Sequence, residues 1–365
     1  MSRAVVARTA VWVGVLLAVA TGGLTAGPLS ASSAAASTVA PVTRVMLSGD
    51  SITQGFTGGN GSWRYWLWKE IARQGEADQV NFVGPFDYVG KPGTGGRYLH
   101  KDFDRDHAAA IGTTTTVQST RIEQYVADYR PDILVVLLGH NDLADGATPE
   151  ATANRMRTYI ANARAAKPDL KIVLGEVLDA VHTDGSSTFD GANHVLNDYY
   201  AQIAKDLSTP DSPITIANTQ YSGWDPRTMT WDGTHPTPRG ETRIAQRIAW
   251  ALRRPVIGLL HEDPQIGGNP QWEPNVRPAV TSPRRHHILV DWSADRQGVH
   301  GGLGVQRVEI SVHRVGSTST RRIGWTSDTT DAITHAVRGT YRIRVKARRH
   351  WMIGTWGPAL SVTVR

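Results

Sequence analysis

The sequence of 365 residues contains no cysteine. This absence excludes a disulfide framework, a thiolate nucleophile and a zinc site with cysteine ligands. The histidine and acidic residues form no group at the spacing of metal ligands, so we expect no metal and no other cofactor. The fold must therefore be stabilised by packing alone.

Long apolar runs are also scarce. The only one lies near the N-terminus, where Arg3 and Arg8 precede apolar residues 10–20 and small residues follow as far as position 36. This order is typical of a secretory signal peptide, and the apolar core is short for a membrane span. We therefore predict a signal peptide over residues 1–36, a secreted extracellular protein and no stable membrane span.

The net charge of +6 is unevenly distributed. Residues 275–365 contain 15 lysines and arginines against five acidic residues, a net charge of +10, which leaves −4 for the rest of the chain. The basic character therefore belongs to the C-terminal part.

Short apolar segments alternate with helical patterns in the first two thirds of the chain. The segments typical of strands are 45–47, 80–83, 133–138, 171–174 and 214–216, and the helical ones are 62–71, 121–129, 149–166, 193–207 and 238–253. The third strand segment is apolar on both faces, which indicates a central parallel strand. We predict an α/β fold with a doubly wound, parallel, five-stranded sheet of flavodoxin-like order 2-1-3-4-5.

A different pattern follows a stretch rich in proline, glycine and asparagine at 258–283. Alternating segments typical of strands lie at 287–292, 305–315, 321–326, 340–348 and 359–364. They predict a small all-β sandwich without helices, with Trp292 in the core and Tyr341 at a corner. The predicted domains are residues 42–257 (α/β), residues 258–274 (linker) and residues 275–365 (sandwich).

Ser51 follows the first predicted strand within the segment G-D-S-I-T-Q-G, residues 49–55. In an open parallel sheet, ligands bind at the carboxyl ends of the strands. A hydroxyl at this position is a candidate nucleophile, although Gly-Asp-Ser is also an ordinary turn. A nucleophilic serine needs a general base and donors for an oxyanion.

Two other loops are predicted to meet Ser51. Asn141, in G-H-N-D after the third strand, has an amide donor that can hold an oxyanion, but Asn-Asp is also a common turn. Asp232 and His235, in W-D-G-T-H before the last helix, can act as orienting carboxylate and general base. The alternative for this pair is a capping carboxylate and an exposed histidine.

Together, the blocks G-D-S-I, G-H-N-D and D-G-T-H, with a glycine between the first two, resemble the SGNH hydrolases, also called GDSL esterases and lipases, over about residues 42–253. The resemblance implies Ser51 as nucleophile, His235 as base and Asp232 as its orienter. It also implies an oxyanion hole of the Ser51 and Gly112 backbone N–H groups and the Asn141 side chain. The second block departs most from the family pattern, and Gly95 or Gly96 are alternatives to Gly112.

The surroundings of Ser51 are similar to secreted carbohydrate esterases of this family, such as acetyl xylan esterases, and no long apolar lid is visible. We therefore expect a serine esterase that hydrolyses carboxylic esters, with short acyl groups such as acetyl carried on a carbohydrate. One alternative is a secreted lipase or lysophospholipase. Another is a noncatalytic protein that binds cell wall or polysaccharide.

The segments H-I-L-V-D-W-S, T-Y-R-I-R-V-K-A-R and W-G-P-A-L-S-V-T-V resemble a fibronectin type III module. Within the second segment, Arg342, Arg344, Lys346 and Arg348 alternate, so they should share one face of a strand. This row suits an acidic polysaccharide or a cell-wall polyanion, or it forms a solubilising outer face. Nucleic acid is not expected as a partner of a secreted protein.

Overall fold

The computed structural model describes residues 41–55, 62–90, 98, 100–220, 223–274, 276–296 and 304–365. The predicted signal peptide lies outside the described residues. Within the described ranges, no helix is both long enough and apolar enough to cross a membrane.

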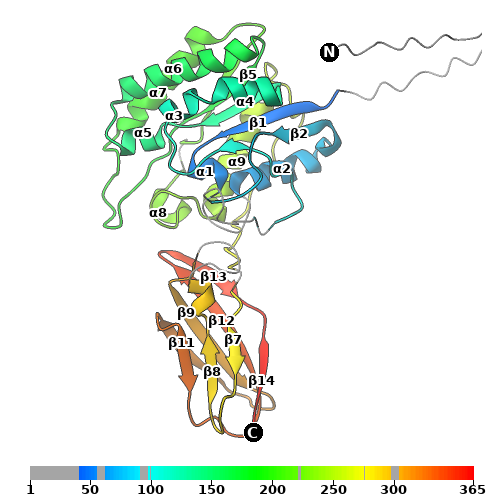
Figure 1. The fold of residues 1–365 in the computed structure, drawn as a ribbon, viewed down its shortest axis with the longest axis vertical. Coiled ribbons are helices and arrows are strands. Elements are labelled where there is room, and N and C mark those ends of the chain that lie inside the picture. The colour runs from blue at the N-terminus through cyan, green and yellow to red at the C-terminus, as the bar shows by residue number, and fades with distance from the viewer. Residues whose placement is uncertain are drawn as a thin grey trace, which may run out of the picture. The chain divides into compact units, whose positions relative to one another are not determined.

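The first part of the described chain forms a parallel sheet with helices on both faces (Figure 1). Its five longer strands are β1 (Thr43–Gly49), β2 (Val80–Val83), β4 (Ile133–Leu137), β5 (Lys171–Gly175) and β6 (Ile214–Ala217), in the order β2-β1-β4-β5-β6. The predicted parallel α/β sheet is confirmed, but it has six strands in place of five. The sixth, β3 (Ala108–Ala109), pairs with the end of β1 and is too short to leave a periodic signal.

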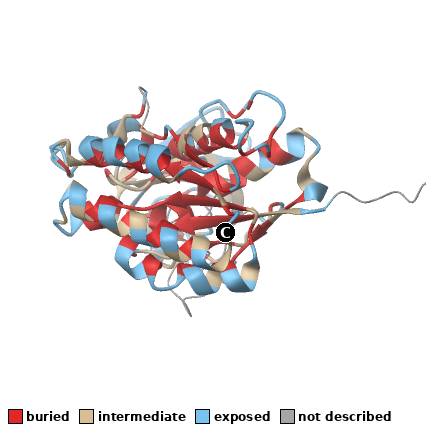
Figure 2. Ribbon diagram, turned by 90° about the horizontal axis from the view of Figure 1, so that it is seen from above, coloured by how far each residue is buried: buried red, intermediate tan, exposed pale blue. Residues whose placement is uncertain are grey.

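Two buried clusters cover the two faces of this sheet. Side chains alternate across a strand, so Val45 and Leu47 of β1 join one cluster and Met46 joins the other. The first cluster contains α2 (Ser62–Arg73) and α9 (Pro238–Leu252), and the second contains α4 (Ile122–Tyr129), α6 (Pro149–Ala166) and α7 (Ala192–Leu207). Figure 2 shows the buried strands between helices whose outer sides are exposed.

Helix boundaries near the site follow ordinary capping chemistry. Threonine precedes proline at the starts of α6 and α9, and the hydroxyls of Thr148 and Thr237 accept hydrogen bonds from the backbone N–H groups of Ala151 and Gly240. Proline suits the first helical position because its missing N–H would have no partner there. The shorter helices are α1 (Ser51–Gln54), η1 (Ala77–Gln79), α3 (Thr115–Ser119), α5 (His140–Ala144) and α8 (Pro226–Met229).

The C-terminal part contains two antiparallel sheets. One has the order β11-β8-β7, formed by β7 (Ala279–Thr281), β8 (Ile288–Asp291) and β11 (Thr330–Ile333). The other contains β9 (Arg307–Arg314), β10 (Thr320–Thr326), β12 (Gly339–Arg349), β13 (Met352–Trp356) and β14 (Leu360–Val364). Side chains of both sheets join one buried cluster that includes Trp292. The Tyr341 hydroxyl donates to the Val337 carbonyl oxygen at 2.8 Å.

Two expectations for this region were wrong or incomplete. The helical turn α10 (Ser293–Arg296) interrupts a region in which we expected no helix, and β7, β11 and β13 were not expected as strands. These strands are short and partly exposed, so their alternation is weak. The predicted linker also packs, because Leu260 and Ile266 join a core cluster of the α/β sheet and Trp272 joins the β cluster.

Candidate active site

Ser51 lies at the first position of α1, and Asp50 alone separates it from the end of β1. The Asp50 side chain caps this helix, because its Oδ1 accepts a hydrogen bond from the Ile52 backbone N–H at 2.9 Å. A residue at the start of a helix has a backbone N–H without an intrahelical partner. The turn from β1 to α1 therefore presents both the hydroxyl and the N–H of Ser51 at the carboxyl edge of the sheet.

His235 lies within hydrogen-bonding distance of both other members of the predicted triad. Its Nε2 is 2.9 Å from Ser51 Oγ, and its Nδ1 is 2.7 Å from Asp232 Oδ2. Asp232 Oδ1 also accepts from the backbone N–H of His235 at 2.7 Å. The loop between α8 and α9 thus supplies the histidine and its carboxylate as one unit.

The protonation states follow from the partners. Burial opposes ionisation of Asp232, but hydrogen bonds from His235 and its backbone outweigh burial and leave the pKa of Asp232 below its ordinary value. An ionised carboxylate only accepts hydrogen bonds, so His235 Nδ1 must donate to Asp232. In a neutral imidazole the other nitrogen, Nε2, is then the acceptor for the Ser51 hydroxyl proton.

Glycine at position 233 is required by the backbone of this loop. Its φ of +96° lies in the left-handed region, and a Cβ there would be 1.9 Å from the Val181 carbonyl oxygen. The Val181 N–H in turn donates to the Gly233 carbonyl at 3.0 Å. This close contact holds the loop that carries Asp232 and His235.

Asn141 occupies α5, which follows β4 on the neighbouring strand end. Its Nδ2 donates to the Thr113 carbonyl oxygen at 2.8 Å and lies 3.4 Å from Asp50 Oδ2. The long second contact leaves one N–H of the amide able to donate to a ligand oxygen. Gly139 permits this turn, because its φ is +113° and a Cβ would lie 2.7 Å from the Tyr200 hydroxyl.

Gly112 lies in the loop that supports Asn141. This loop is hydrogen bonded to α1, the helix of Ser51, since the Ile111 N–H donates to Gln54 Oε1 at 3.1 Å. Gly112 has a φ of +70° and is exposed, and the next residue, Thr113, accepts from Asn141. The alternatives Gly95 and Gly96 lie outside the described residues.

Comparison with known families decides the identity of this part of the chain. Residues 47–243, more than half of the sequence, match the model of the GDSL-like Lipase/Acylhydrolase family. The chain belongs to this family.

Three similar proteins are esterases by name. A multidomain esterase of Ruminococcus flavefaciens is 24% identical over 226 residues, which cover 58% of this chain and 28% of the relative, so the chain spans under a third of that relative's length. Two crystal structures, of an acetyl esterase mutant with an acetate ion and of a carbohydrate esterase family 3 protein from Talaromyces cellulolyticus, are each 26% identical, with TM-scores of 0.51. In both comparisons, 59% of this chain and 98% of the solved chain are covered.

Two buried carboxylates of this GDSL-like protein were not singled out from the sequence. Burial raises the pKa of Asp50 to about 6. Asp142 is fully buried, accepts hydrogen bonds from the Thr115 backbone and hydroxyl, and pairs with Arg155 at 2.9 Å. Both residues lie inside the motifs G-D-S and H-N-D, so their presence in the blocks was the available signal.

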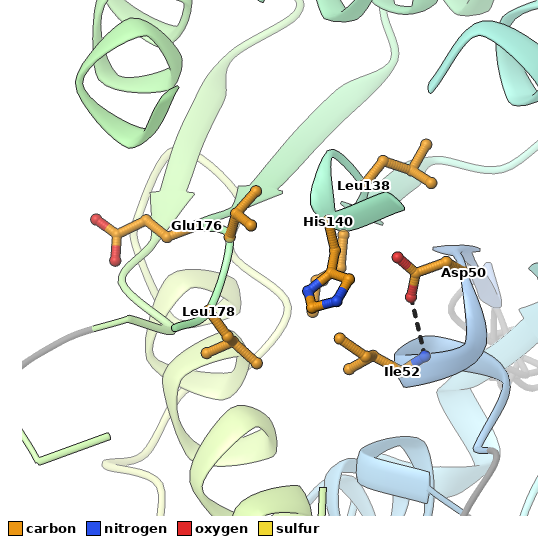
Figure 3. A pocket seen from close by; sticks show the side chains of 8 residues that line it. Asp50, Ile52, Leu138, His140, Glu176 and Leu178 are labelled. Carbon is orange, nitrogen blue, oxygen red and sulfur yellow. Dashed lines mark hydrogen bonds between the residues drawn. The ribbon is translucent and has the colours of Figure 1, made fainter. Parts of the chain in front are cut away.

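A small cavity is lined by the two residues that flank Ser51 in the GDSL-like part of the chain (Figure 3). It has a volume of about 20 Å³, and its lining consists of Asp50, Ile52, Leu137, Leu138, His140, Glu176, Val177 and Leu178. Figure 3 shows the His140 ring between Ile52 and Leu178, whereas the carboxylate of Glu176 points away. Burial, with the nearby His235, lowers the pKa of His140 to about 4, so this ring is neutral at pH 7.

Trp231, directly before Asp232, links the triad loop to C-terminal residues. Its ring stacks with the His235 ring at a centroid distance of 5.7 Å, and the Arg349 guanidinium lies 4.9 Å from the Trp231 ring. Trp231 is buried in the cluster that contains Trp292. Sequence reasoning missed this contact because Trp231 and Arg349 are distant in the chain.

The described residues hold no group of three or more His, Asp or Glu side chains arranged to bind a metal ion.

Proposed function

We propose that this protein is a secreted serine esterase that hydrolyses carboxylic esters through an acyl-enzyme. The observation that carries the proposal is the continuous path from Ser51 Oγ to His235 Nε2 at 2.9 Å and from His235 Nδ1 to Asp232 Oδ2 at 2.7 Å. Membership of the GDSL-like family supports it.

The proposed reaction has two steps. In the first, His235 Nε2 takes the Ser51 proton while Oγ attacks the ester carbonyl carbon, and the tetrahedral oxyanion is held by Ser51 N–H, Gly112 N–H and Asn141 Nδ2. The intermediate then collapses, and the leaving alcohol takes the proton from His235. In the second, His235 deprotonates a water that attacks the acyl carbon, which releases the acid and restores Ser51.

The acyl group is proposed to be short, such as acetyl, on a carbohydrate carrier. The cavity lined by Asp50 and Ile52, the chain neighbours of Ser51, is small and mainly apolar, with Leu178 also at its wall, which supports a short acyl chain. The acetyl esterase and carbohydrate esterase structures among the similar proteins support the same substrate class.

A panel of p-nitrophenyl esters of increasing chain length, together with acetylated xylan, tests this assignment. The wild type is expected to hydrolyse acetyl esters fastest, and Ser51→Ala to lose activity on every substrate. Leu178→Ala should shift the preference toward longer chains, because it enlarges the cavity wall. A wild type that prefers long acyl chains would favour the lipase alternative.

A wild-type protein that hydrolyses none of these esters but binds polysaccharide would favour the noncatalytic alternative. The connected Ser51, His235 and Asp232 side chains speak against that alternative, because a binding protein has no need of such a path.

Secretion and a fibronectin type III-like C-terminal module are also part of the proposal. The basis for secretion is the signal-like pattern of residues 1–36. The basis for the module is the pair of antiparallel sheets with one core, the buried Trp292 and the Tyr341 hydrogen bond at a corner. N-terminal sequencing of the protein recovered from culture medium tests the first point.

A further inference from the structure

The outer face of the larger C-terminal sheet gathers positive charge. In the register of β12 with β9, Arg344 lies opposite Ser311, Arg342 opposite His313, and Arg348 opposite Arg307. The next strand, β10, adds Arg322, which pairs with Ser311. We call this surface the basic face, and its cationic residues are Arg307, Arg322, Arg342, Arg344, Lys346 and Arg348.

Buried and exposed residues alternate along β12, which shows that Arg342, Arg344, Lys346 and Arg348 form a row on the outer face. Ile343 and Val345 are buried in the core, whereas Arg342 and Arg344 between and beside them are exposed. Residues two apart in a strand are separated by about 6.7 Å. The row from Arg342 to Arg348 therefore extends over about 20 Å, enough for several units of an extended polymer.

Little negative charge offsets the row. The only acidic residue on the described outer-face positions of β9, β10 and β12 is Glu309, which lies opposite Lys346 in the sheet and whose Oε1 is 3.7 Å from Arg322 Nη1. No ion pair among the described residues involves Arg342, Arg344, Lys346 or Arg348. Arg342, Arg344 and Arg348 thus have no acidic residue opposite them on β9 and keep their charge available to a ligand.

We propose that the basic face binds a polysaccharide that carries carboxylate groups, such as one containing uronic acids. Arginine guanidinium groups bind carboxylates through two parallel hydrogen bonds, which suits a row of arginines better than a row of lysines. The choice of a polysaccharide rests on the proposed carbohydrate esterase function, because a bound polymer would hold acyl groups near the enzyme.

A nucleic-acid ligand is disfavoured by the aromatic residue on this face. Single-stranded nucleic acid binds through bases stacked on exposed aromatic rings. Trp356, opposite Lys346 in the sheet, is half-buried, and Arg322 and Lys346 lie 5.5 and 5.8 Å from its ring. The cations therefore occupy the positions that stacked bases require.

Binding of the full chain to immobilised polygalacturonate tests the proposal. The protein carries Ser51→Ala so that binding is measured without hydrolysis, and neutral xylan without acetyl groups is the reference polymer. We expect binding to polygalacturonate that weakens with added salt, and a loss of about tenfold or more in Arg342→Ser/Arg344→Ser.

The matched control is Arg284→Ser/Arg285→Ser, which removes the same charge from the segment before β8, off the basic face. Its affinity should change less than about threefold. A second pair compares Arg322→Ser with Arg321→Ser, neighbours on β10 of which only Arg322 shares the face of Ser311. With Ser51 restored, all four variants should retain wild-type hydrolysis of p-nitrophenyl acetate.

Equal losses of polygalacturonate affinity in the two double variants would show that only the net charge of the protein matters. This result would overturn the basic face as a binding site. Tighter binding to double-stranded DNA or to polyphosphate than to polygalacturonate at equal salt would overturn the carboxylate assignment. Failure of ester hydrolysis with intact polygalacturonate binding would overturn the proposed esterase function and leave the basic face in place.

Discussion

At the scale of single residues, the amide nitrogen of Asn141 has one short and one long hydrogen bond. One N–H holds the Thr113 carbonyl at 2.8 Å, and the other has only the long contact with Asp50. An oxyanion that forms at Ser51 would take over this second N–H. The support from Thr113 fixes the amide before substrate arrives, which is what electrostatic preorganisation requires.

Asn141→Ala should therefore lower kcat by about 100- to 1000-fold with little change in KM, the usual effect of removing an oxyanion donor. Steady-state kinetics on p-nitrophenyl acetate measure this. Asn162→Ala is the control, because it also removes an amide donor from a backbone carbonyl, that of Ser119, and Asn162 is not one of the predicted site residues. A loss of less than about fivefold in Asn141→Ala would remove Asn141 from the oxyanion hole.

The buried carboxyl of Asp50 makes stability depend on pH. Burial raises its pKa from 3.8 to about 6, so between these values the folded chain holds a proton that the unfolded chain has lost. Stability therefore falls as pH rises through this window. The fall from this residue alone is on the order of 3 kcal/mol.

Asp50→Asn should lack this fall, because an amide does not titrate and its oxygen can still accept from the Ile52 N–H. Urea unfolding between about pH 4 and pH 8 measures the free energy of unfolding of both proteins. The difference, variant minus wild type, should rise until about pH 6 and then stay constant. Parallel pH profiles for the two proteins would mean that Asp50 does not carry this titration.

At the scale of elements, the loop between α8 and α9 depends on one backbone conformation. Gly233 combines a positive φ with a Cβ position only 1.9 Å from the Val181 carbonyl. Any side chain must displace either the loop or the segment of Val181. Displacement of the loop moves Asp232 and His235 together, since they are hydrogen bonded to each other within it.

Gly233→Ala should cost at least about 2 kcal/mol of stability and should lower kcat. Gly146→Ala isolates the effect of φ, because Gly146 has a φ of +84° but nothing within 4 Å of its Cβ position. Gly146→Ala should lower stability by about 1 kcal/mol and leave kcat unchanged. Thermal unfolding and steady-state kinetics of both variants make the comparison, and equal effects would exclude the contact with Val181 as the cause.

At the scale of the whole molecule, the triad loop and the C-terminal sheets are linked through Trp231. The ring of Trp231 stacks with the imidazole of His235 and also contacts the guanidinium of Arg349. Burial lowers the pKa of Arg349, although the charge of Asp232 opposes this, and its Nη1 donates to the Gly304 carbonyl oxygen at 2.5 Å. The C-terminal part therefore contacts the loop that carries Asp232 and His235 through Trp231.

Arg349→Ala should lower stability by about 1 kcal/mol through the lost cation–π contact, and should reduce kcat a few-fold. Arg349→Lys keeps a cation and should therefore lose less stability and less kcat than Arg349→Ala. A double-mutant cycle with Trp231→Phe measures the coupling between the two side chains by chemical unfolding. A coupling energy of zero would show that Arg349 stabilises the protein independently of Trp231.

The sequence by itself determined the elements that have strong local signals. Helix α6 was predicted over about residues 149–166, and the structure gives it the bounds Pro149–Ala166 with a Thr148 cap, which is a local feature. Strand β4 was predicted as central because it is apolar throughout. The parallel α/β sheet and the antiparallel C-terminal strands follow from such local patterns. Ser51, Asn141, Asp232 and His235 were also chosen from short motifs.

The tertiary structure alone decided how those parts meet. Strand β3 exists only because residues 108–109 reach the end of β1, and the raised pKa of Asp50 exists only because neighbouring elements exclude water from it. The contact between Trp231 and Arg349 joins residues more than a hundred positions apart. Local chemistry specifies secondary structure and motif, whereas burial, register and long-range contact are properties of the packed chain.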